Sequence, residues 1–509
     1  MAALDDVPDV AARLRRTAAD RADRPALLVG DRRVTYGQLH DRVDRVTAAL
    51  QGAGVGPGDR VAIVLGNTVE FVEVYAGVLR AGAAFVPLLT GLAPDELRHA
   101  LADAGARLVV VGPERAEALS SLRDELPDLE LLVVVGDAEV DGATAYEGWL
   151  AAAGEPALVE RAPDDLAALV YTSGTTGRPR GAMLTRGNLS ANQAQSLAGR
   201  FEVGADDVVL LVLPLAHIYA LNVGLGACIA AGATMLVVER FDPDGTLRAI
   251  ADHGATVVLG APPMYVAWLE GGHLADADLS GVRLAVSGAA PLGVPTYERF
   301  LEATGIAIEE GYGLTEAAPS VSATSMAPVP LPGSVGHPLP GIELRLVGPD
   351  GQDVEPGDPG EVWVRGPNVF AGYWQDADAT AAALTADGWL RTGDVGTRGE
   401  AGELYLVDRL RDLIIVNGFN VYPREVERVL LGDDAVADVA VVGEPHPLTG
   451  ETVVAHVLPR RDAQVDTDAL VARCRRELAR YKTPTRIEVV AALPYTATGK
   501  VRRRELRGT

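Results

Sequence analysis

The stretch Tyr171-Thr-Ser-Gly-Thr-Thr-Gly-Arg-Pro-Arg-Gly-Ala-Met-Leu-Thr-Arg-Gly-Asn-Leu189 decides how this chain is interpreted. The apolar run Leu166–Thr172 overlaps its start and predicts a buried strand. Residues 173–181 are rich in Gly, Ser and Thr and hold two arginines, so we expect a loop there, with a helix beginning near Gly187. Glycines in such a loop let backbone N–H groups converge, and hydroxyls and arginines add donors, which suits triphosphate oxygens. The pattern GxxxxGK followed by Ser or Thr is absent, so this is not a Walker A loop.

On both sides of this loop, short apolar runs alternate with helical patterns, for example at residues 61–65, 108–111 and 208–213. Such alternation is typical of an α/β fold. The segments around the first and last of these runs also resemble each other, because Gly82 and Gly105 match Gly232 and Gly254 at nearly equal offsets. A duplication and two merely similar βαβ units would both give this pattern. Either one predicts two stacked α/β layers.

The pattern of predicted secondary structure changes twice toward the C-terminus. From about Gly333 the sequence indicates strands separated by Gly and Pro turns, and after Arg411 it indicates a compact α+β segment. A chain of 509 residues is also too long for one compact core. We therefore expect a large N-terminal domain, residues 1–410, of two stacked α/β subdomains plus a small β unit. Residues 411–509 would form a small α+β C-terminal domain.

Charge and cysteine content limit the partners and the compartment. The net charge of −25 disfavours binding to nucleic acid or to an anionic membrane surface. The two cysteines, Cys228 and Cys474, are too few for a disulfide framework or a zinc cluster, which favours a reducing cytosol. We recognise no secretion signal and no run of 18 apolar residues, so we expect a cytoplasmic protein without integral membrane association.

Four further motifs follow the loop in order. They are Glu310-Gly-Tyr-Gly-Leu-Thr-Glu316, Trp389-Leu-Arg-Thr-Gly-Asp394, the run at residues 408–427, and Leu493-Pro-Tyr-Thr-Ala-Thr-Gly-Lys500. Together with the loop they resemble the adenylate-forming superfamily over nearly the whole chain. That superfamily contains acyl- and aryl-CoA synthetases, amino-acid adenylation domains and luciferases. The chain departs from the family pattern at Arg180, usually Lys, at Arg411, usually Asp or Lys, and at Ala216, usually aromatic.

The resemblance implies ATP, Mg²⁺ and coenzyme A as cofactors. It assigns nucleotide binding to Thr172, Ser173, Gly174, Thr175, Thr176, Gly177, Arg180, Gly288, Ala289, Ala290, Gly311, Tyr312, Gly313, Asp394 and Arg409. It assigns catalysis to Lys500, Thr315, Glu316 and His217, coenzyme A binding to Gly418 and Phe419, and the hinge of a mobile C-terminal domain to Arg411.

Chemistry supports some of these roles independently of the resemblance. Glu316 is a hard oxygen ligand suited to Mg²⁺, and a carboxylate such as Asp394 accepts two ribose hydroxyls well. Taken alone, Asp394 could equally belong to an Asx turn, and His217 is more typical of a satisfied core histidine.

The function expected is that of an ATP-dependent acid–thiol ligase. A carboxylate would attack the α-phosphate of ATP to give acyl-AMP and pyrophosphate, and the thiol of coenzyme A would then displace AMP. An amino-acid adenylation module is disfavoured, because residues 210–238 contain no acidic residue to hold an amine. A non-catalytic nucleotide sensor would be expected to lose Glu316, Asp394 or Lys500. A ligase that loads a free-standing acyl carrier protein stays open, and a luciferase-like oxygenase is remote.

The acid itself is the least constrained part of the prediction. The expected pocket residues are His217, Ala220, Leu221, Gly224, Ala261 and Met264. Apart from a proton on His217 they carry no charge, and the small ones leave room for length. We therefore expect a medium-to-long-chain fatty acid, with a benzoate- or cinnamate-type acid as the alternative. The partners are small molecules, and the sequence does not fix the oligomeric state, for which a homodimer is one candidate.

Lys500 gives the first test. Only Lys482 and Lys500 are lysines among the 45 basic side chains, and a compact ammonium fits between a carboxylate and a phosphate better than a planar guanidinium. We expect Lys500→Ala to slow adenylation by at least roughly 10²–10³-fold and to spare thioester formation from supplied acyl-AMP. Lys500→Arg should also be poor. Pyrophosphate release and thioester formation are measured separately, and equal loss in both would contradict a lysine that acts in only one half-reaction.

Overall fold

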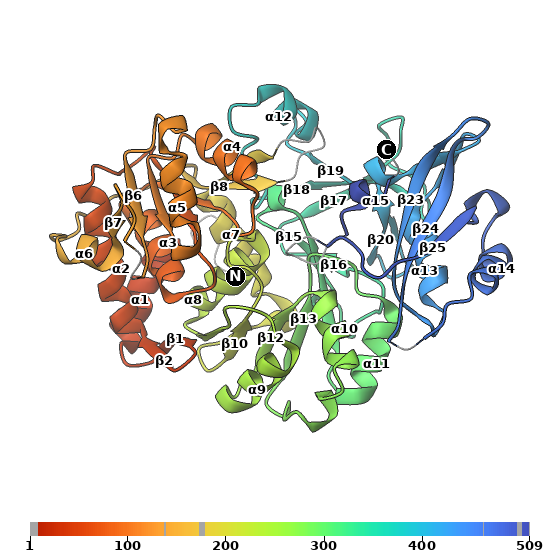
Figure 1. Ribbon diagram of the computed structural model, residues 1–509, viewed down its shortest axis with the longest axis horizontal. Helices are drawn as coiled ribbons and strands as arrows, with labels where there is room; N and C mark the ends of the chain where they lie inside the picture. Colours follow the sequence, from red (N-terminus) through yellow and green to blue (C-terminus); the bar gives the residue numbers. More distant parts are fainter. Residues whose placement is uncertain (1–8, 137–138, 173–178, 462, 496–500, 508–509) are drawn as a thin grey trace.

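The computed structural model describes residues 9–136, 139–172, 179–461, 463–495 and 501–507. The predicted site residues Ser173, Gly174, Thr175, Thr176, Gly177 and Lys500 lie outside the described residues. A large N-terminal part carries two stacked β-sheets with helices, followed by a small antiparallel sheet, and a smaller α+β part lies beside it at the C-terminal end (Figure 1). The expected fold class is confirmed.

The first sheet has seven strands in the order β7-β6-β5-β3-β4-β8-β9. Its strands are β3 (Arg60–Val64), β4 (Ala84–Pro87), β5 (Leu108–Val111), β6 (Leu131–Val134), β7 (Thr144–Ala145), β8 (Leu166–Thr172) and β9 (Arg180–Thr185). All neighbours are parallel except β8 and β9, which form an antiparallel pair. The central strands are apolar without alternation because both faces are covered.

The second sheet has nine strands in the order β16-β15-β14-β13-β12-β10-β11-β1-β2. Its strands are β1 (Pro25–Val29), β2 (Arg32–Thr35), β10 (Val208–Leu211), β11 (Thr234–Val237), β12 (Val257–Gly260), β13 (Leu284–Ser287), β14 (Ile308–Gly313), β15 (Ser320–Ala323) and β16 (His337–Pro338). The N-terminal strand β1 joins this sheet beside β11, a pairing between distant segments that local sequence patterns do not reveal.

The two segments that resemble each other in sequence also share one topology. In the first sheet β3 lies between β4 and β5, and in the second β10 lies between β11 and β12. The four matched glycines play the same part, because each ends a helix in the left-handed conformation, with φ of 83° at Gly82, 57° at Gly105, 72° at Gly232 and 62° at Gly254. The predicted pair of stacked α/β layers is therefore present.

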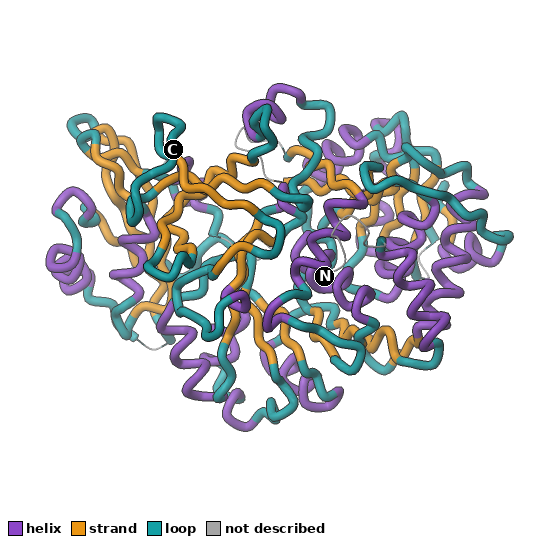
Figure 2. The backbone as a smooth tube through the Cα atoms, turned by 180° about the vertical axis from the view of Figure 1, so that it is seen from behind, coloured by secondary structure: helices purple, strands orange, loops and turns teal. Residues whose placement is uncertain are grey.

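Helices cover the outer faces of the sheets and also fill the space between them (Figure 2). They are α1 (Val10–Arg21), α2 (Tyr36–Gly52), α3 (Val69–Ala81), α4 (Pro94–Ala104), α5 (Pro113–Ser121), α6 (Tyr146–Ala151), α7 (Arg186–Ser196), η4 (Tyr219–Gly226), α8 (Ala227–Ala231), α9 (Pro243–His253), α10 (Pro262–Glu270), α11 (Val294–Thr304) and α12 (Ala377–Ala383). Alternate strand residues face different clusters: Val61 and Ile63 belong to the central core, whereas Ala62 and Val64 pack under α4 and α5.

The described residues of the quoted stretch form the end of strand β8, the strand β9 and the start of helix α7. The strand Leu166–Thr172 has the predicted limits, but the expected loop is shorter than predicted, because β9 begins at Arg180 and Thr172 faces Arg180 in the antiparallel register. Arg180 and Gly181 therefore belong to a strand. Helix α7 begins at Arg186, where Thr185 and Asn188 form a capping box.

The small sheet and the C-terminal part complete the chain. Strands β17 (Glu343–Val347), β18 (Gly360–Arg365), β19 (Leu390–Arg398) and β20 (Leu404–Arg409) form an antiparallel sheet. The C-terminal part has strands β21 (Ile414–Val416), β22 (Phe419–Val421), β23 (Val436–His446), β24 (Gly450–Pro459) and β25 (Arg486–Val489), with helices α13 (Pro423–Leu431), α14 (Thr467–Glu477) and α15 (Arg503–Leu506).

The C-terminal part has a hydrophobic core of its own, built from residues at and beyond Ile414. The 3₁₀ turn η8 (Leu410–Asp412) leads into it from β20. An ion pair between Arg460 and Glu270, 2.8 Å long, joins it to helix α10 of the N-terminal part. A domain boundary between residues 410 and 411 stays our proposal.

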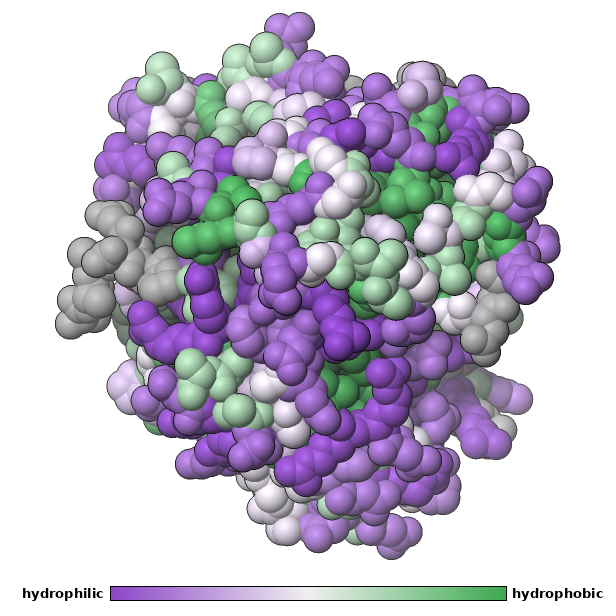
Figure 3. All heavy atoms as spheres, turned by 90° about the vertical axis from the view of Figure 1, so that its left-hand side faces the viewer, coloured by the Kyte–Doolittle hydropathy of each residue, from purple (hydrophilic) through white to green (hydrophobic). Residues whose placement is uncertain are grey.

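The outer face of the N-terminal part that is turned to the viewer in Figure 3 is mainly hydrophilic, with hydrophobic residues in scattered patches. In the described part of the chain, no helix combines the length and the apolar character that a membrane crossing needs.

Candidate functional site

The predicted nucleotide residues converge on a buried carboxylate. Asp394 on β19 is 4% exposed; it accepts a hydrogen bond from the Tyr312 hydroxyl at 2.7 Å and forms an ion pair with Arg409 Nε at 2.9 Å. Arg409 is directly opposite Asp394 on the neighbouring strand β20. The negative charge of Asp394 raises the pKa of Arg409, and burial together with that charge raises the pKa of Tyr312 well above its usual value. Arg409 therefore stays charged and Tyr312 stays neutral at neutral pH.

The two glycines beside Tyr312 have different roles. A Cβ on Gly313 would lie 2.1 Å from the Pro319 carbonyl oxygen, so this position admits no side chain. A Cβ on Gly311 would meet its nearest atom only at 3.9 Å, which leaves this side of the strand open. The open side beside the large Tyr312 ring leaves room for a flat base.

Three buried amides hold the turn that follows Thr315 and Glu316. The Nδ2 groups of Asn192, Asn222 and Asn368 donate to backbone oxygens between residues 317 and 320, at 2.6–3.1 Å. Each comes from a different element or loop, namely α7, η4 and the segment after β18. Since these amides are almost fully buried, they hold firmly the turn that directly follows Thr315 and Glu316.

Glu316 lies next to the hairpin of strands β8 and β9, which carries the predicted phosphate loop. Its Oε1 accepts a hydrogen bond from the Tyr373 hydroxyl at 2.7 Å. The Tyr373 ring lies 5.8 Å from the guanidinium of Arg180, and Arg180 Nε forms an ion pair with Asp376 at 3.1 Å. Tyr373 and Asp376 belong to no motif that the sequence analysis recognised. The sequence signal for them would have been the Gly372-Tyr373 pair, which lies near Glu316 only in the folded chain.

The segment 288–290 follows β13 in a strained turn. Ala289 has φ of 68°, in the left-handed region that residues other than glycine rarely adopt. A Cβ on Gly288 would lie 3.0 Å from Cζ of Tyr219, so this glycine lets the Tyr219 ring pack against the turn. His217 lies just before η4, partly exposed, and its Nδ1 accepts a hydrogen bond from the Tyr219 amide at 3.3 Å.

The predicted acyl-pocket residues do not all come together. Ala220 and Leu221 belong to the central hydrophobic cluster, whereas Met264 belongs to the cluster under α9, α10 and α11 on the opposite face of the sheet. Ala261 is buried and precedes α10. The space that the small residues were expected to leave for a long acid is also reduced, because a Cβ on Gly224 would lie 2.9 Å from the side chain of Leu211.

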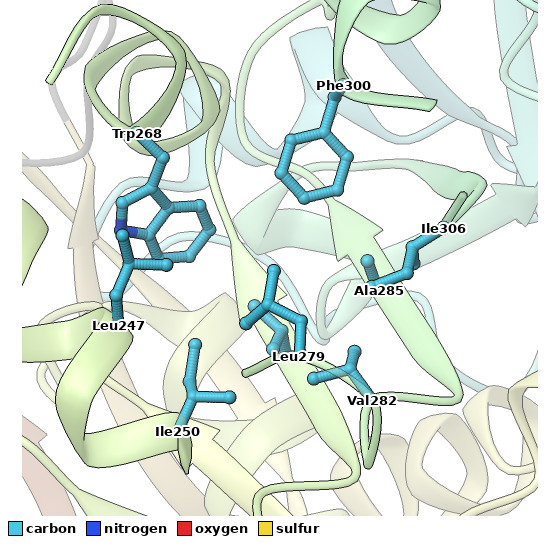
Figure 4. Close-up of a pocket in the computed structure, with 9 residues that line it drawn as sticks. Leu247, Ile250, Trp268, Leu279, Val282, Ala285, Phe300 and Ile306 are labelled. Atoms are coloured by element: carbon cyan, nitrogen blue, oxygen red, sulfur yellow. The ribbon is translucent and has the colours of Figure 1, made fainter. Parts of the chain in front are cut away.

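A cavity lies in the hydrophobic cluster under helices α9, α10 and α11, but it is not an acyl site. Its walls are apolar: Leu247, Ile250, Val258, Trp268, Leu279, Val282, Ala285, Phe300 and Ile306 (Figure 4). Its volume of about 10 Å³ is at most that of one water molecule.

Glu310 is a buried carboxyl group that the sequence analysis named only as the start of a motif. Burial raises its pKa to about 8, and the Leu292 amide donates to its Oε2 at 3.2 Å. Glu310 is therefore largely protonated at neutral pH and adds little negative charge next to Gly311.

The predicted coenzyme A residues form a tight hairpin in the C-terminal part. Asn417 and Gly418 connect β21 and β22 with φ of 52° and 81°, as in a type I′ turn. A Cβ on Gly418 would meet no described atom within 4 Å, and the exposed ring of Phe419 stacks on Tyr481 at 4.8 Å. Arg411 is exposed in η8.

Comparison with known proteins was made on this basis. The family model described as AMP-binding enzyme matches residues 14–374, and the model described as AMP-binding enzyme C-terminal domain matches residues 425–500. A feruloyl-CoA synthase of Amycolatopsis is 40% identical over 94% of this chain and 94% of its own length. A long-chain-fatty-acid–CoA ligase of Escherichia coli is 35% identical over 97% of this chain and 93% of its own.

Among solved structures, the anthranilate CoA ligase AuaEII in complex with anthranoyl-AMP superimposes with a TM-score of 0.92. It is 28% identical, and the match covers 98% of this chain and 96% of that chain.

The hairpin gives the second test. We expect Gly418→Leu to leave pyrophosphate release nearly intact and to block acylation of coenzyme A, because the side chain would fill the path of the pantetheine arm. Gly418→Ala is the matched control, since it has the same left-handed backbone cost of about 1 kcal/mol without the bulk. Acylation by Gly418→Leu at the rate of Gly418→Ala would show that no ligand passes this turn.

Proposed function

The chain belongs to the AMP-binding enzyme family and is an AMP-forming acyl-CoA synthetase, and we propose that its two parts divide the reaction between them. The enzyme uses ATP, Mg²⁺ and coenzyme A. In the first half-reaction a carboxylate oxygen of the acid attacks the α-phosphorus of ATP, and pyrophosphate leaves. In the second, the thiol sulfur of coenzyme A attacks the acyl carbon, and AMP leaves.

For the first half-reaction, the donor sets fit the proposed ligands. Each oxygen of Asp394 has one partner, Tyr312 or Arg409, and keeps a lone pair for a ribose hydroxyl. Glu316 uses Oε1 for Tyr373, which leaves Oε2 for a cation. Mg²⁺ commonly binds through one or two carboxylates plus substrate phosphates, so a single glutamate is sufficient, and bound Mg²⁺ would neutralise phosphate charge. Arg180 and the loop at residues 173–177 would hold the phosphates.

For the second half-reaction, we propose that the C-terminal domain turns about Arg411. Lys500 would face the α-phosphate before the turn and the hairpin around Gly418 would face the site after it. Gly418 lies in the C-terminal part, which has its own hydrophobic core, whereas Asp394 lies on β19, and this division supports a turn of one part relative to the other. We further propose a cytosolic location, supported by the free, buried Cys228 and Cys474. A homodimer stays a candidate.

The acid is proposed to be an aryl or aryl-propenoic acid with a hydroxyl on its ring. The observation that carries this is the Tyr219 hydroxyl: it is buried and makes no hydrogen bond with a described residue. An unpaired buried hydroxyl costs about 1–3 kcal/mol. A ligand hydroxyl that pairs with Tyr219 would remove this cost. The relatives named feruloyl-CoA synthase and anthranilate CoA ligase give independent support.

A medium-to-long-chain fatty acid is the second candidate. The apolar, buried Ala220 and Leu221 favour it, as does the relative named as a long-chain-fatty-acid ligase. Burial of an alkyl chain would add about 0.8 kcal/mol per CH₂. Against it, the space beside Gly224 and Gly288 is taken by Leu211 and Tyr219.

The third test compares the two candidates directly. We expect kcat/KM with coenzyme A to be highest for a hydroxylated cinnamate, lower for cinnamate and benzoate, and lowest across a series of fatty acids. Tyr219→Phe should lower kcat/KM for the hydroxylated acid about 10-fold, corresponding to ~1.4 kcal/mol, and leave unsubstituted cinnamate unchanged.

Tyr265→Phe is the matched control for this test, because the Tyr265 hydroxyl already donates to the Val286 carbonyl at 2.8 Å. It should not change the ratio between the two acids. An efficiency that rises steadily over several carbons of the fatty series, with no effect of Tyr219→Phe on the ratio, would select the fatty acid instead.

A further inference from the structure

Tyr373 contacts two charged side chains, Glu316 and Arg180, and Arg180 lies in the β8–β9 hairpin. Its hydroxyl donates to Glu316 Oε1 at 2.7 Å, and its ring lies 5.8 Å from the centre of the Arg180 guanidinium. One side chain thus lies between the carboxylate proposed for Mg²⁺ and the cation proposed for the phosphates.

The backbone around Tyr373 is tied to the same hairpin. Residues 371–374 run beside β9, where the amide of Met183 donates to Gly372 and the amide of Trp374 donates to Gly181, at 2.9 and 2.8 Å. The Tyr373 amide itself donates to Thr380 Oγ1 at 2.9 Å. These bonds fix the backbone of Tyr373 relative to the strand that carries Arg180.

Two more contacts complete the arrangement. Asp376 forms its ion pair with Arg180 at 3.1 Å and also caps helix α12 by accepting a hydrogen bond from the Ala379 amide. The ring of Phe370 packs edge-on against Tyr373 at 5.0 Å, and the Phe370 amide donates to the Glu316 carbonyl oxygen at 2.9 Å. Glu316 is therefore held at its backbone and at one carboxylate oxygen by the same short segment.

We propose that Tyr373 is a positioning residue for the adenylation half-reaction, which orients the free oxygen of Glu316 toward Mg²⁺ and supports the Arg180 guanidinium beneath the phosphates. This rests on the proposed roles of Glu316 and Arg180. The hydroxyl acts only as a donor, because burial, with the charge of Glu316, raises the pKa of Tyr373 far above neutral pH. Since groups behind a metal ligand commonly change metal affinity 10–100-fold, the loss of this donor should be measurable.

The experiment measures ATP binding by calorimetry with and without Mg²⁺, which needs no turnover. Tyr373→Phe keeps the ring and removes the hydroxyl. We expect the gain in ATP affinity on adding Mg²⁺ to fall about 10-fold, with ATP binding in the absence of Mg²⁺ unchanged. The Mg²⁺ concentration for half-maximal pyrophosphate release should rise, and thioester formation from supplied acyl-AMP should keep its rate.

Tyr405→Phe is the matched control, because Tyr405 on β20 donates to Glu403 at 3.2 Å in a tyrosine–glutamate pair that contacts none of the proposed nucleotide residues. It should leave the Mg²⁺ effect unchanged.

Glu316→Gln separates the failure of this inference from the failure of the proposed function. If Glu316→Gln abolishes the Mg²⁺ effect while Tyr373→Phe retains it in full, Tyr373 does not position the carboxylate and the inference is overturned. If both variants retain the full Mg²⁺ effect, Glu316 is not the metal ligand and the proposed function fails at that point. A lower melting temperature of Tyr373→Phe with an unchanged Mg²⁺ effect also overturns the inference, because it would indicate a purely structural role.

Discussion

The site depends on keeping the charge of Asp394 in a place almost closed to water. A carboxylate in such a place is unfavourable unless ion pairs and hydrogen bonds compensate for lost hydration, and removing one partner of a buried pair costs about 3–5 kcal/mol. Arg409 and Tyr312 provide that compensation from β20 and β14, which belong to different sheets. The need to pair one carboxylate thus fixes the small antiparallel sheet against the end of the nine-stranded sheet.

Hydrogen bonds from buried amide groups likewise organise the turn after Glu316. Amides from α7, from η4 and from the segment after β18 donate to the backbone oxygens of Ala317, Ala318 and Ser320. Asn222 is the most informative of them, because it lies on the helical segment that also carries Tyr219. The wall of the proposed acid pocket and the turn that carries Glu316 therefore share one rigid support, and the acid and the nucleotide are presented to each other by a preorganised frame.

The sequence predicted the parts of this arrangement that depend on local pattern. The limits of β8 follow from an apolar run, and the two stacked α/β layers follow from the similarity of the segments around Gly82 and Gly232. The hairpin partner β9 was not predicted, because Arg180 and Gly181 are typical of a loop and become strand residues only by pairing with β8. Local sequence patterns could not predict the packing of Leu211 against Gly224 or the contact of Tyr373 with Glu316. Both contacts depend on which distant side chain fills a given space.

The ion pair between Arg460 and Glu270 has a consequence for how easily the C-terminal part can leave its place. The Glu270 oxygen that accepts from Arg460 also accepts from Arg299 of α11, at 2.9 Å. When Arg460 withdraws, the carboxylate still has a cationic neighbour, and the departing guanidinium, a quarter exposed already, enters water. Neither group is left as a buried charge without a partner. The ion pair therefore stabilises this orientation of the C-terminal part only weakly, by under about 1 kcal/mol. Millimolar substrates and ordinary salt concentrations can outweigh so small a free-energy difference.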